Sequence, residues 1–241
     1  MRIQFEFKMD HLPLAYRLSI LSIIKEMIRN GSESYYEKLF VESKQELKPF
    51  AFATYIQDLQ IAEDIIYGSK LFLTISSPSY EFIMYLMNGS KRESSYIYKD
   101  ISLKLISKRL LPKPPELTET VTFKTLSPIL IENKEQKPLL ATDESFEKEL
   151  NYYANLLSQE LYGTELEQRI KVIQTNMKKV VIQENVHQMQ AENIYFTGNS
   201  GFIQLQGARD DLQKIYDSGI GLRRSLGFGL LGIEEVGDRH G

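Results

Sequence analysis

Residues 219–233 read GIGLRRSLGFGLLGI, a segment in which five glycines surround the adjacent Arg223 and Arg224. Glycine tolerates positive φ and lets a second backbone approach closely. Successive backbone N–H groups in such a loop can form a concave anion site, and arginine adds a planar donor that matches phosphate oxygens. The segment therefore predicts a phosphate-binding loop. A second interpretation is that the glycines only allow a bulged strand to pack tightly.

The spacing of these glycines fits neither the P-loop nor the dinucleotide-binding fingerprint, which disfavours a nucleotide-binding enzyme. The chain has 241 residues, of which 42% are hydrophobic and 25% charged, as expected for a folded globular protein. Its formal net charge is -3, so a nucleic-acid site would have to be a local basic cluster.

The chain contains no cysteine, which excludes disulfides, thiolate nucleophiles and cysteine zinc sites. No apolar run approaches the roughly 18 residues that cross a bilayer. The first ten residues alternate as in a strand and do not resemble a signal peptide. We therefore expect a cytoplasmic protein that makes no membrane contact and holds no metal or cofactor.

The order of elements in the first half of the chain predicts a ferredoxin-like domain. The expected elements are a strand over 1–10, helices over 12–29 and 33–41, strands over 48–56 and 70–77, a helix over 77–90 and a long strand over 96–111. Pro13 falls in the first turn of the first helix, where proline is tolerated. The sequence strand, helix, strand, strand, helix, strand is the split βαβ arrangement of the ferredoxin-like fold.

Three prolines in PKPPE (112–116) predict a linker, after which the same order repeats. The expected elements are a strand over 119–131, a helix over 143–163 that starts at an aspartate cap, strands over 169–183 and 193–207, a helix over 208–219 and a strand over 226–236. We also expect a hairpin turn at 198–201. The prediction is an α+β fold of two ferredoxin-like domains, residues 1–112 and 118–241.

The glycine-rich segment, placed between a short helix and the last strand, resembles the carboxyl-terminal motif of RAMP proteins. More closely, it resembles that of the CRISPR-associated endoribonucleases of the sixth Cas family. Three further stretches are similar to that family: LPLAYRLSILSIIKEMI (12–28), LKPFAFATY (47–55) and TLSPILI (125–131). The resemblance covers most of the chain in order, and it implies a RAMP-type tandem ferredoxin-like fold.

This resemblance implies a metal-independent cut within each repeat of precursor CRISPR RNA. The ribose 2′-hydroxyl attacks the adjacent phosphate and leaves a 2′,3′-cyclic phosphate and a 5′-hydroxyl. Such a reaction needs a base, an acid and positive charge on the phosphorane. The implied partners are repeat RNA and a CRISPR effector complex, with the chain acting as a monomer or homodimer.

The chain departs from the family pattern at the catalytic residues. Many members carry a histidine shortly before the KPF-like strand, where this chain has Glu42, and a tyrosine in the first helix, where it has Lys25. Lys48 corresponds to the family's lysine. The three histidines are His11, His187 and His240, the last two interpreted as strand surface and tail.

Three catalytic interpretations follow. In the first, lysines stabilise the phosphorane and a tyrosine moves a proton; the candidates are Lys25, Lys38, Lys48, Tyr35 and Tyr36. In the second, His11 supplies the imidazole, against the alternative that it only begins a helix. In the third, the protein binds repeat RNA without cutting it.

The expected RNA-binding residues lie in the second half of the chain. They are Gly219, Gly221, Arg223, Arg224, Ser225, Gly227 and Gly229 in the loop, with Arg169, Lys171, Lys178 and Lys179 on or beside a strand. Such cations contact phosphates and position RNA without reading its sequence. The alternative functions are a non-cleaving RNA-binding or scaffold subunit of a CRISPR ribonucleoprotein, and a small-ligand regulatory protein of paired ferredoxin-like domains.

Overall fold

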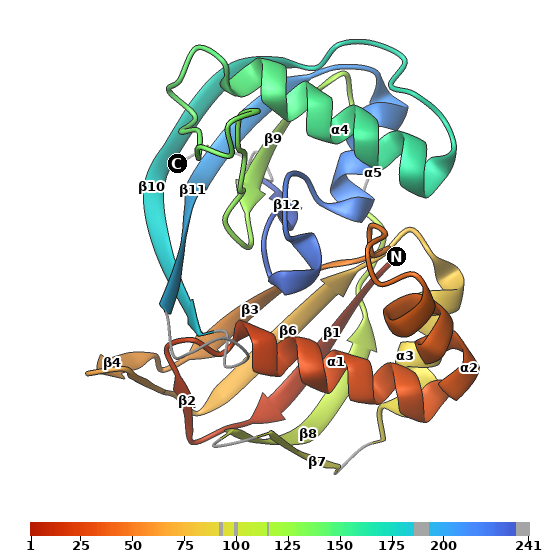
Figure 1. Ribbon diagram of the computed structural model, residues 1–241, viewed down its shortest axis with the longest axis vertical. Helices are drawn as coiled ribbons and strands as arrows, with labels where there is room; N and C mark the ends of the chain where they lie inside the picture. Colours follow the sequence, from red (N-terminus) through yellow and green to blue (C-terminus); the bar gives the residue numbers. More distant parts are fainter. Residues whose placement is uncertain (92–93, 99–100, 115, 186–192, 235–241) are drawn as a thin grey trace, which may run out of the picture.

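The computed structural model describes residues 1–91, 94–98, 101–114, 116–185 and 193–234. The first half of the chain forms a five-stranded sheet in the order β3-β6-β1-β8-β7, with its helices on one face (Figure 1). Its elements are β1 (Arg2–Lys8), α1 (Arg17–Gly31), α2 (Glu33–Tyr36), a π-helical turn (Glu37–Glu42), β3 (Ala51–Gln57), β6 (Lys70–Ser76), α3 (Tyr80–Gly89), β7 (Ser95–Tyr98) and β8 (Ile101–Leu110).

Alternation along β1 decides which face of this sheet is buried. Ile3, Phe5 and Phe7 are fully buried and join α1 in one hydrophobic cluster, whereas Gln4 and Glu6 point to the other face. Strand β1 pairs antiparallel with both β6 and β8. The order β3-β6-β1-β8 is that of the predicted ferredoxin-like domain.

The second half repeats this arrangement. Its elements are β9 (Thr120–Thr125), α4 (Phe146–Tyr162), β10 (Lys171–Asn185), β11 (Asn193–Gln206), α5 (Arg209–Ser218), a 3-10 turn (Arg224–Leu226) and β12 (Leu231–Ile233). The sheet order β10-β11-β9-β12 places these strands as β3-β6-β1-β8 lie in the first half. A separate hydrophobic cluster fills this half. The predicted tandem ferredoxin-like α+β fold is therefore confirmed.

A small sheet that the sequence analysis missed lies beside the first half. Its strands are β2 (His11–Pro13), β4 (Gln60–Ala62) and β5 (Ile65–Tyr67), in the order β2-β5-β4. Because residues 11–13 pair with β5, the first helix begins at Arg17 and not at 12, and Pro13 lies in a strand. The predicted long strand over 96–111 is two strands, β7 and β8.

The predicted hairpin turn at 198–201 is wrong. Strand β11 continues through these residues and stays paired with β10, with Gly198 opposite Val180 and Gly201 opposite Met177. A side chain at Gly201 would meet the carbonyl oxygen of Asn176 at 2.2 Å, so this glycine permits close strand approach rather than a turn.

Three boundaries in the second half also differ from expectation. Strand β9 ends at Thr125, and the closing strand β12 covers only Leu231–Ile233 among the described residues. Asp143 does not cap α4, because its carboxylate accepts from the backbone N–H of Leu140. Gly163 ends that helix in the left-handed conformation, as expected.

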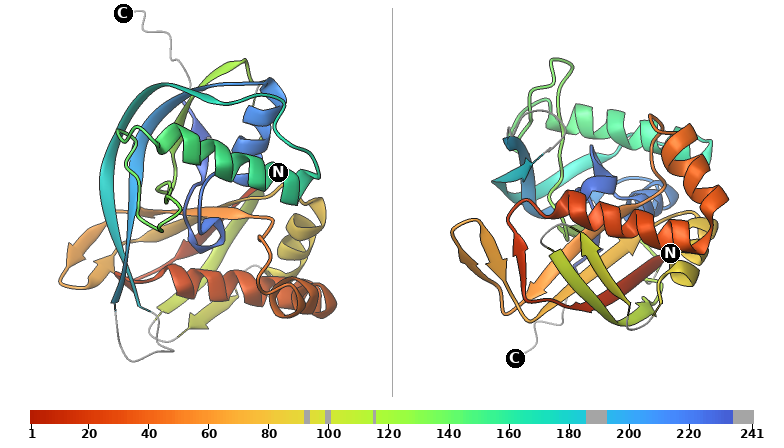
Figure 2. Two further views of the ribbon diagram at one scale, coloured as in Figure 1. Left: turned by 45° about the horizontal axis from the view of Figure 1, so that its top comes forward. Right: turned by 60° about the horizontal axis from the view of Figure 1, so that its bottom comes forward.

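The two halves stack on each other, and the long β10–β11 hairpin curves from the second half to the first (Figure 2). Ala51 and Ala53 of β3 form a small buried cluster with Leu230. The Arg2 guanidinium lies 3.5 Å from the centroid of the Tyr216 ring and donates to the Tyr216 carbonyl. The division into residues 1–112 and 118–241 stays a prediction, supported by the two separate hydrophobic clusters. Within the described part of the chain, no helix combines the length and apolarity required to cross a membrane.

Candidate nucleic-acid interface

The glycine-rich loop runs from the end of α5 to β12 and is tightly packed. Gly219, Gly221, Gly227 and Gly229 all have φ between 69° and 83°. A Cβ at Gly229 would lie 1.9 Å from the carbonyl oxygen of Ile220, and one at Gly221 would lie 2.4 Å from that of Leu130. These glycines are therefore required by backbone packing and by left-handed φ.

Three of the four predicted loop glycines donate their backbone N–H to protein carbonyls. Gly219 donates to Ile215, Gly227 to Arg224 and Gly229 to Pro128, at 2.8–3.2 Å. These N–H groups have partners inside the protein, and direct RNA binding by the loop glycines stays a prediction. The hydrogen bonds fix the loop backbone and so the positions from which its side chains project.

The two adjacent arginines have different environments. Arg224 is 4% exposed, and its guanidinium donates to the Ser218 carbonyl at 2.6 Å and to the Lys48 carbonyl at 3.0 Å. Burial lowers the pKa of Arg224 to about 10. Arg224 is therefore buried and donates inside the protein, so its predicted contact with RNA stays a prediction that its burial does not favour.

Arg223 is exposed on the loop surface, and its guanidinium carbon lies 4.7 Å from the centroid of the Phe196 ring. Phe196 belongs to β11 and packs edge-to-face on Phe228, with ring centroids 5.5 Å apart. Arg17, at the start of α1, lies 5.4 Å from the Phe228 centroid. The loop, the β10–β11 hairpin and α1 therefore meet in one cluster of arginines and aromatic rings.

The cations on β10 do not converge on this cluster as a group. Arg169 precedes the strand and forms an ion pair with Glu147 at 3.0 Å. Lys178 and Lys179 are consecutive strand residues, so their side chains project from opposite faces of the sheet. Lys171 is exposed near the start of the strand, and Ser225 is half-buried in the 3-10 turn.

Lys48 lies beside the loop because its carbonyl accepts from Arg224. Its ammonium group donates to the Ser43 carbonyl. Burial lowers the pKa of Lys48, and Lys25 nearby lowers it further, against an opposing effect of Glu46. The Lys25 ammonium lies 5.1 Å from the Phe40 ring centroid, and burial lowers its pKa too. Lys25 thus lies close enough to Lys48 to affect its pKa, and Lys48 is joined to the loop through its carbonyl.

The two predicted tyrosines are packed against neighbouring rings. Tyr35 lies 4.9 Å from Tyr85, and burial raises the pKa of its phenol, so the group stays protonated. Tyr36 contacts Phe40, and the Arg29 guanidinium carbon lies 3.9 Å from its ring centroid. Lys38 is exposed on the π-helical turn.

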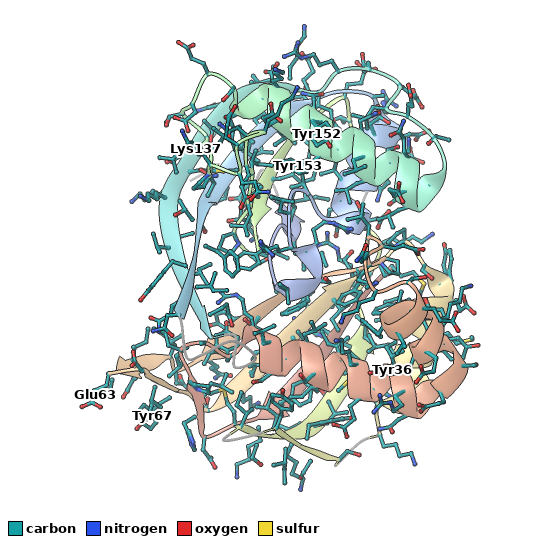
Figure 3. All side chains as sticks on the ribbon, in the orientation of Figure 1. Tyr36, Glu63, Tyr67, Lys137, Tyr152 and Tyr153 are labelled. Atoms are coloured by element: carbon teal, nitrogen blue, oxygen red, sulfur yellow. The ribbon has the colours of Figure 1, made fainter. Side chains whose placement is uncertain are left out.

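His11 lies away from these groups. It sits in β2 opposite Tyr67, with ring centroids 6.5 Å apart. Tyr67 and Tyr36 lie at opposite ends of the first half (Figure 3). The structure therefore does not place His11 with the lysines, and His187 and His240 fall outside the described residues. Within the described chain, we find no group of three or more histidine, aspartate or glutamate side chains positioned to hold a metal ion.

Sequence reasoning missed several side chains at the surface between the two halves. Tyr55 and Phe72 form an aromatic pair on the uncovered face of the first sheet, with centroids 6.0 Å apart and Tyr55 66% exposed. Glu184 of β10 forms an ion pair with Arg17 at 3.4 Å. The register of the strands brings these residues together, and no local motif marks them.

The fold and loop define a RAMP-type protein of tandem ferredoxin-like halves. The chain belongs to the Cas6 family, because residues 111–233 match the family described as CRISPR associated protein Cas6, C-terminal. No curated protein matches the chain.

Solved structures agree with this assignment at the level of the fold. A structure described as CRISPR associated protein Cas6 shares 22% identity at a TM-score of 0.76, covering 98% of this chain and 99% of the other. A Cas6-related protein from Pyrococcus furiosus shares 23% identity at a TM-score of 0.77, covering 98% and 100%. A structure described as an RAMP protein binding different RNA substrates shares 22% identity at a TM-score of 0.78, also covering 98% and 100%.

Proposed function

We propose that this chain binds CRISPR repeat RNA and cuts it without a metal, by attack of the 2′-hydroxyl on the adjacent phosphate. The observation that carries the proposal is the position of Lys48. Its backbone carbonyl accepts from Arg224 of the glycine-rich loop, and Lys25 lies close enough to lower the pKa of its ammonium group. Two neighbouring cations, one of them joined to the loop, suit a phosphorane that gains negative charge.

The side chains assign roles that agree with this reaction. We assign positive charge to Lys48 and Lys25, and proton donation to the leaving 5′-oxygen to Tyr35, whose phenol stays protonated because burial raises its pKa. Because the nucleophile belongs to the RNA, alignment of the 2′-hydroxyl with the phosphate contributes a large part of the rate. Arg223 and the aromatic pair Tyr55–Phe72 provide charge and stacking surface for the strand.

The proposal is tested by incubating the purified chain with end-labelled repeat RNA in EDTA. Cleavage that leaves a 2′,3′-cyclic phosphate supports the endoribonuclease. Binding without cleavage supports a non-cleaving subunit of a CRISPR ribonucleoprotein. One observation favours that second candidate. The histidine in the described part of the chain, His11, lies in β2 at the end of the first half opposite α2, so it does not supply an acid–base group beside the predicted tyrosines. Absence of binding at low salt would contradict both and leave a role with small ligands.

Replacing Lys48 with alanine should slow cleavage about 100-fold while repeat binding is retained, because removal of one transition-state donor costs about that much.

The wild-type cleavage rate should also fall as pH rises through the pKa of Lys48, because only the ammonium form carries charge. Burial places that pKa below the ordinary 10.5. Single-turnover rates measured across pH check both statements.

Lys48→Arg is the matched control, because its guanidinium stays charged to higher pH. This variant should retain part of the rate and lose its alkaline decline. Uncatalysed RNA hydrolysis is subtracted at each pH. An unchanged rate in Lys48→Ala would exclude the lysine-centred site.

Replacing Arg223 with alanine should weaken repeat binding and reduce the slope of log affinity against log salt by about one, as for loss of one phosphate contact. The reason is that Arg223 is the exposed arginine of the loop, whereas Arg224 is buried. Arg209→Ala removes another exposed arginine, at the start of α5, and serves as the control. Equal effects of the two substitutions would remove the specific role of the loop.

A further inference from the structure

A cavity of about 140 Å³ lies where β10 and β11 meet the start of α1 and the glycine-rich loop. Its apolar walls are Leu18, Ile194, Phe196 and Leu226, and its polar groups are Arg17, Glu184 and Arg223. We propose that this cavity binds one cytosine base of the RNA, with the Glu184 carboxylate accepting from its exocyclic amino group. This inference rests on the proposed function in RNA binding.

Glu184 supplies the evidence that the cavity is built for a donor. The residue is 3% exposed, and its Oε1 accepts from Arg17 at 3.4 Å. Its Oε2 is buried and has no hydrogen-bond partner among the described residues. Burial raises the pKa of Glu184, and the nearby backbone N–H groups of Arg17 and Leu18 lower it. Neither N–H group makes a hydrogen bond with Oε2. A buried carboxylate oxygen without a donor is costly, so a ligand that brings an N–H group gains from meeting it.

The walls of the cavity suit a flat ring. Unstacked bases in RNA complexes commonly stack on aromatic rings and on guanidinium planes. The Arg223 guanidinium already lies over the Phe196 ring, 4.7 Å from its centroid, so the pair offers one combined stacking surface in the wall of the cavity. An apolar cavity of about 150 Å³ holds benzene, so a volume of this size accepts a single six-membered ring. A pyrimidine therefore fits, whereas a purine exceeds the space.

The polar groups select between the two pyrimidines. Cytosine presents an amino donor beside ring and carbonyl acceptors, and carboxylates accept from that amino group. Arg17 can donate to the adjacent acceptors, since it lines the cavity together with Glu184. Uracil presents a carbonyl oxygen where cytosine has its amino group, and this oxygen would face the carboxylate without a proton between them. The cavity should therefore discriminate against uracil.

The test compares the binding of two ten-residue RNAs, oligo(C) and oligo(U), by fluorescence anisotropy. The wild-type chain should bind oligo(C) about tenfold more tightly, in line with one base-specific contact. Glu184→Gln should bring the affinity ratio close to one, because the amide offers a donor as readily as an acceptor. Glu160→Gln, an exposed position on α4, should keep the wild-type ratio.

The ratio within one variant does not depend on the fraction of molecules that are folded. Phe196→Leu is a second variant, and it should weaken oligo(C) more than oligo(U) by removing the stacking surface. A wild-type ratio near one, or an unchanged ratio in both variants, overturns the cytosine site while leaving repeat binding intact. If the wild-type chain binds neither the two oligonucleotides nor repeat RNA, the proposed function itself is overturned.

Discussion

Replacing Arg224 with alanine should lower the free energy of unfolding by about 3–5 kcal/mol, because two hydrogen bonds from a charged donor are lost and their acceptors stay buried. One acceptor is the carbonyl of Ser218, in the second half of the chain. The other is the carbonyl of Lys48 in the first half, which lies 176 residues before Arg224 in the sequence. Urea unfolding of the full chain measures the loss. The change should also weaken RNA cleavage, since Lys48 loses its attachment to the loop.

Two variants separate the causes of this loss. Arg223→Ala changes the neighbouring residue, which is exposed, and should alter stability by less than about 0.5 kcal/mol. Arg224→Met keeps much of the side-chain volume but donates nothing, so it should remain strongly destabilised. If Arg224→Met were as stable as wild type, packing rather than hydrogen bonding would explain the buried arginine. If Arg223→Ala and Arg224→Ala lowered the free energy of unfolding equally, the hydrogen bonds of the buried Arg224 would not contribute the stability predicted for them.

The contrast between these arginines shows where prediction from sequence ends. Both residues belong to the same glycine-rich segment, and nothing local distinguishes them. Arg223 adopts φ 55°, in the left-handed region. The inward position of Arg224 depends on carbonyls such as that of Lys48, which the chain supplies from the other half. Adjacent residues of one type can therefore lie one at the surface and one in the core, and the sequence alone does not tell which is which.

The fold was more predictable because its signals are local. The alternation of Ile3, Phe5 and Phe7 specifies the first strand and its buried face, and the apolar spacing after Arg17 specifies the helix. The repeated order of elements then predicts both ferredoxin-like halves. The β2-β5-β4 sheet was missed because its strands are only three residues long, and because β2 joins it by pairing with β5, more than fifty residues away.

The candidate site was less predictable because it is assembled by register. Glu184 meets Arg17 across 167 residues, and Tyr55 faces Phe72 only because β3 pairs with β6 in one particular alignment. A shift of one residue would turn these side chains to the other face. The glycines at 198 and 201 predicted a turn for a related reason: in a sequence, a strand glycine that admits a close neighbour cannot be told from a turn glycine.

Gly229→Ala should lower the free energy of unfolding by about 4 kcal/mol or more, a loss that marks a severe backbone conflict. Its Cβ would lie 1.9 Å from the carbonyl oxygen of Ile220, so the loop or its neighbour has to move. The matched control is Gly163→Ala, which has nearly the same positive φ, 71° against 69°, but no atom within 4 Å of the new Cβ. That variant should lose only the left-handed penalty of about 1–2 kcal/mol.

Urea unfolding of the two variants, compared with their affinity for repeat RNA, distinguishes the two interpretations of the glycine-rich loop. If the glycines serve packing, Gly229→Ala loses stability well beyond Gly163→Ala, and RNA affinity falls because Arg223 loses its support. If Gly229→Ala instead costs no more than Gly163→Ala and yet abolishes RNA binding, the open backbone itself contacts phosphate. The amide of Gly229 already donates to Pro128, which makes the first result the expected one.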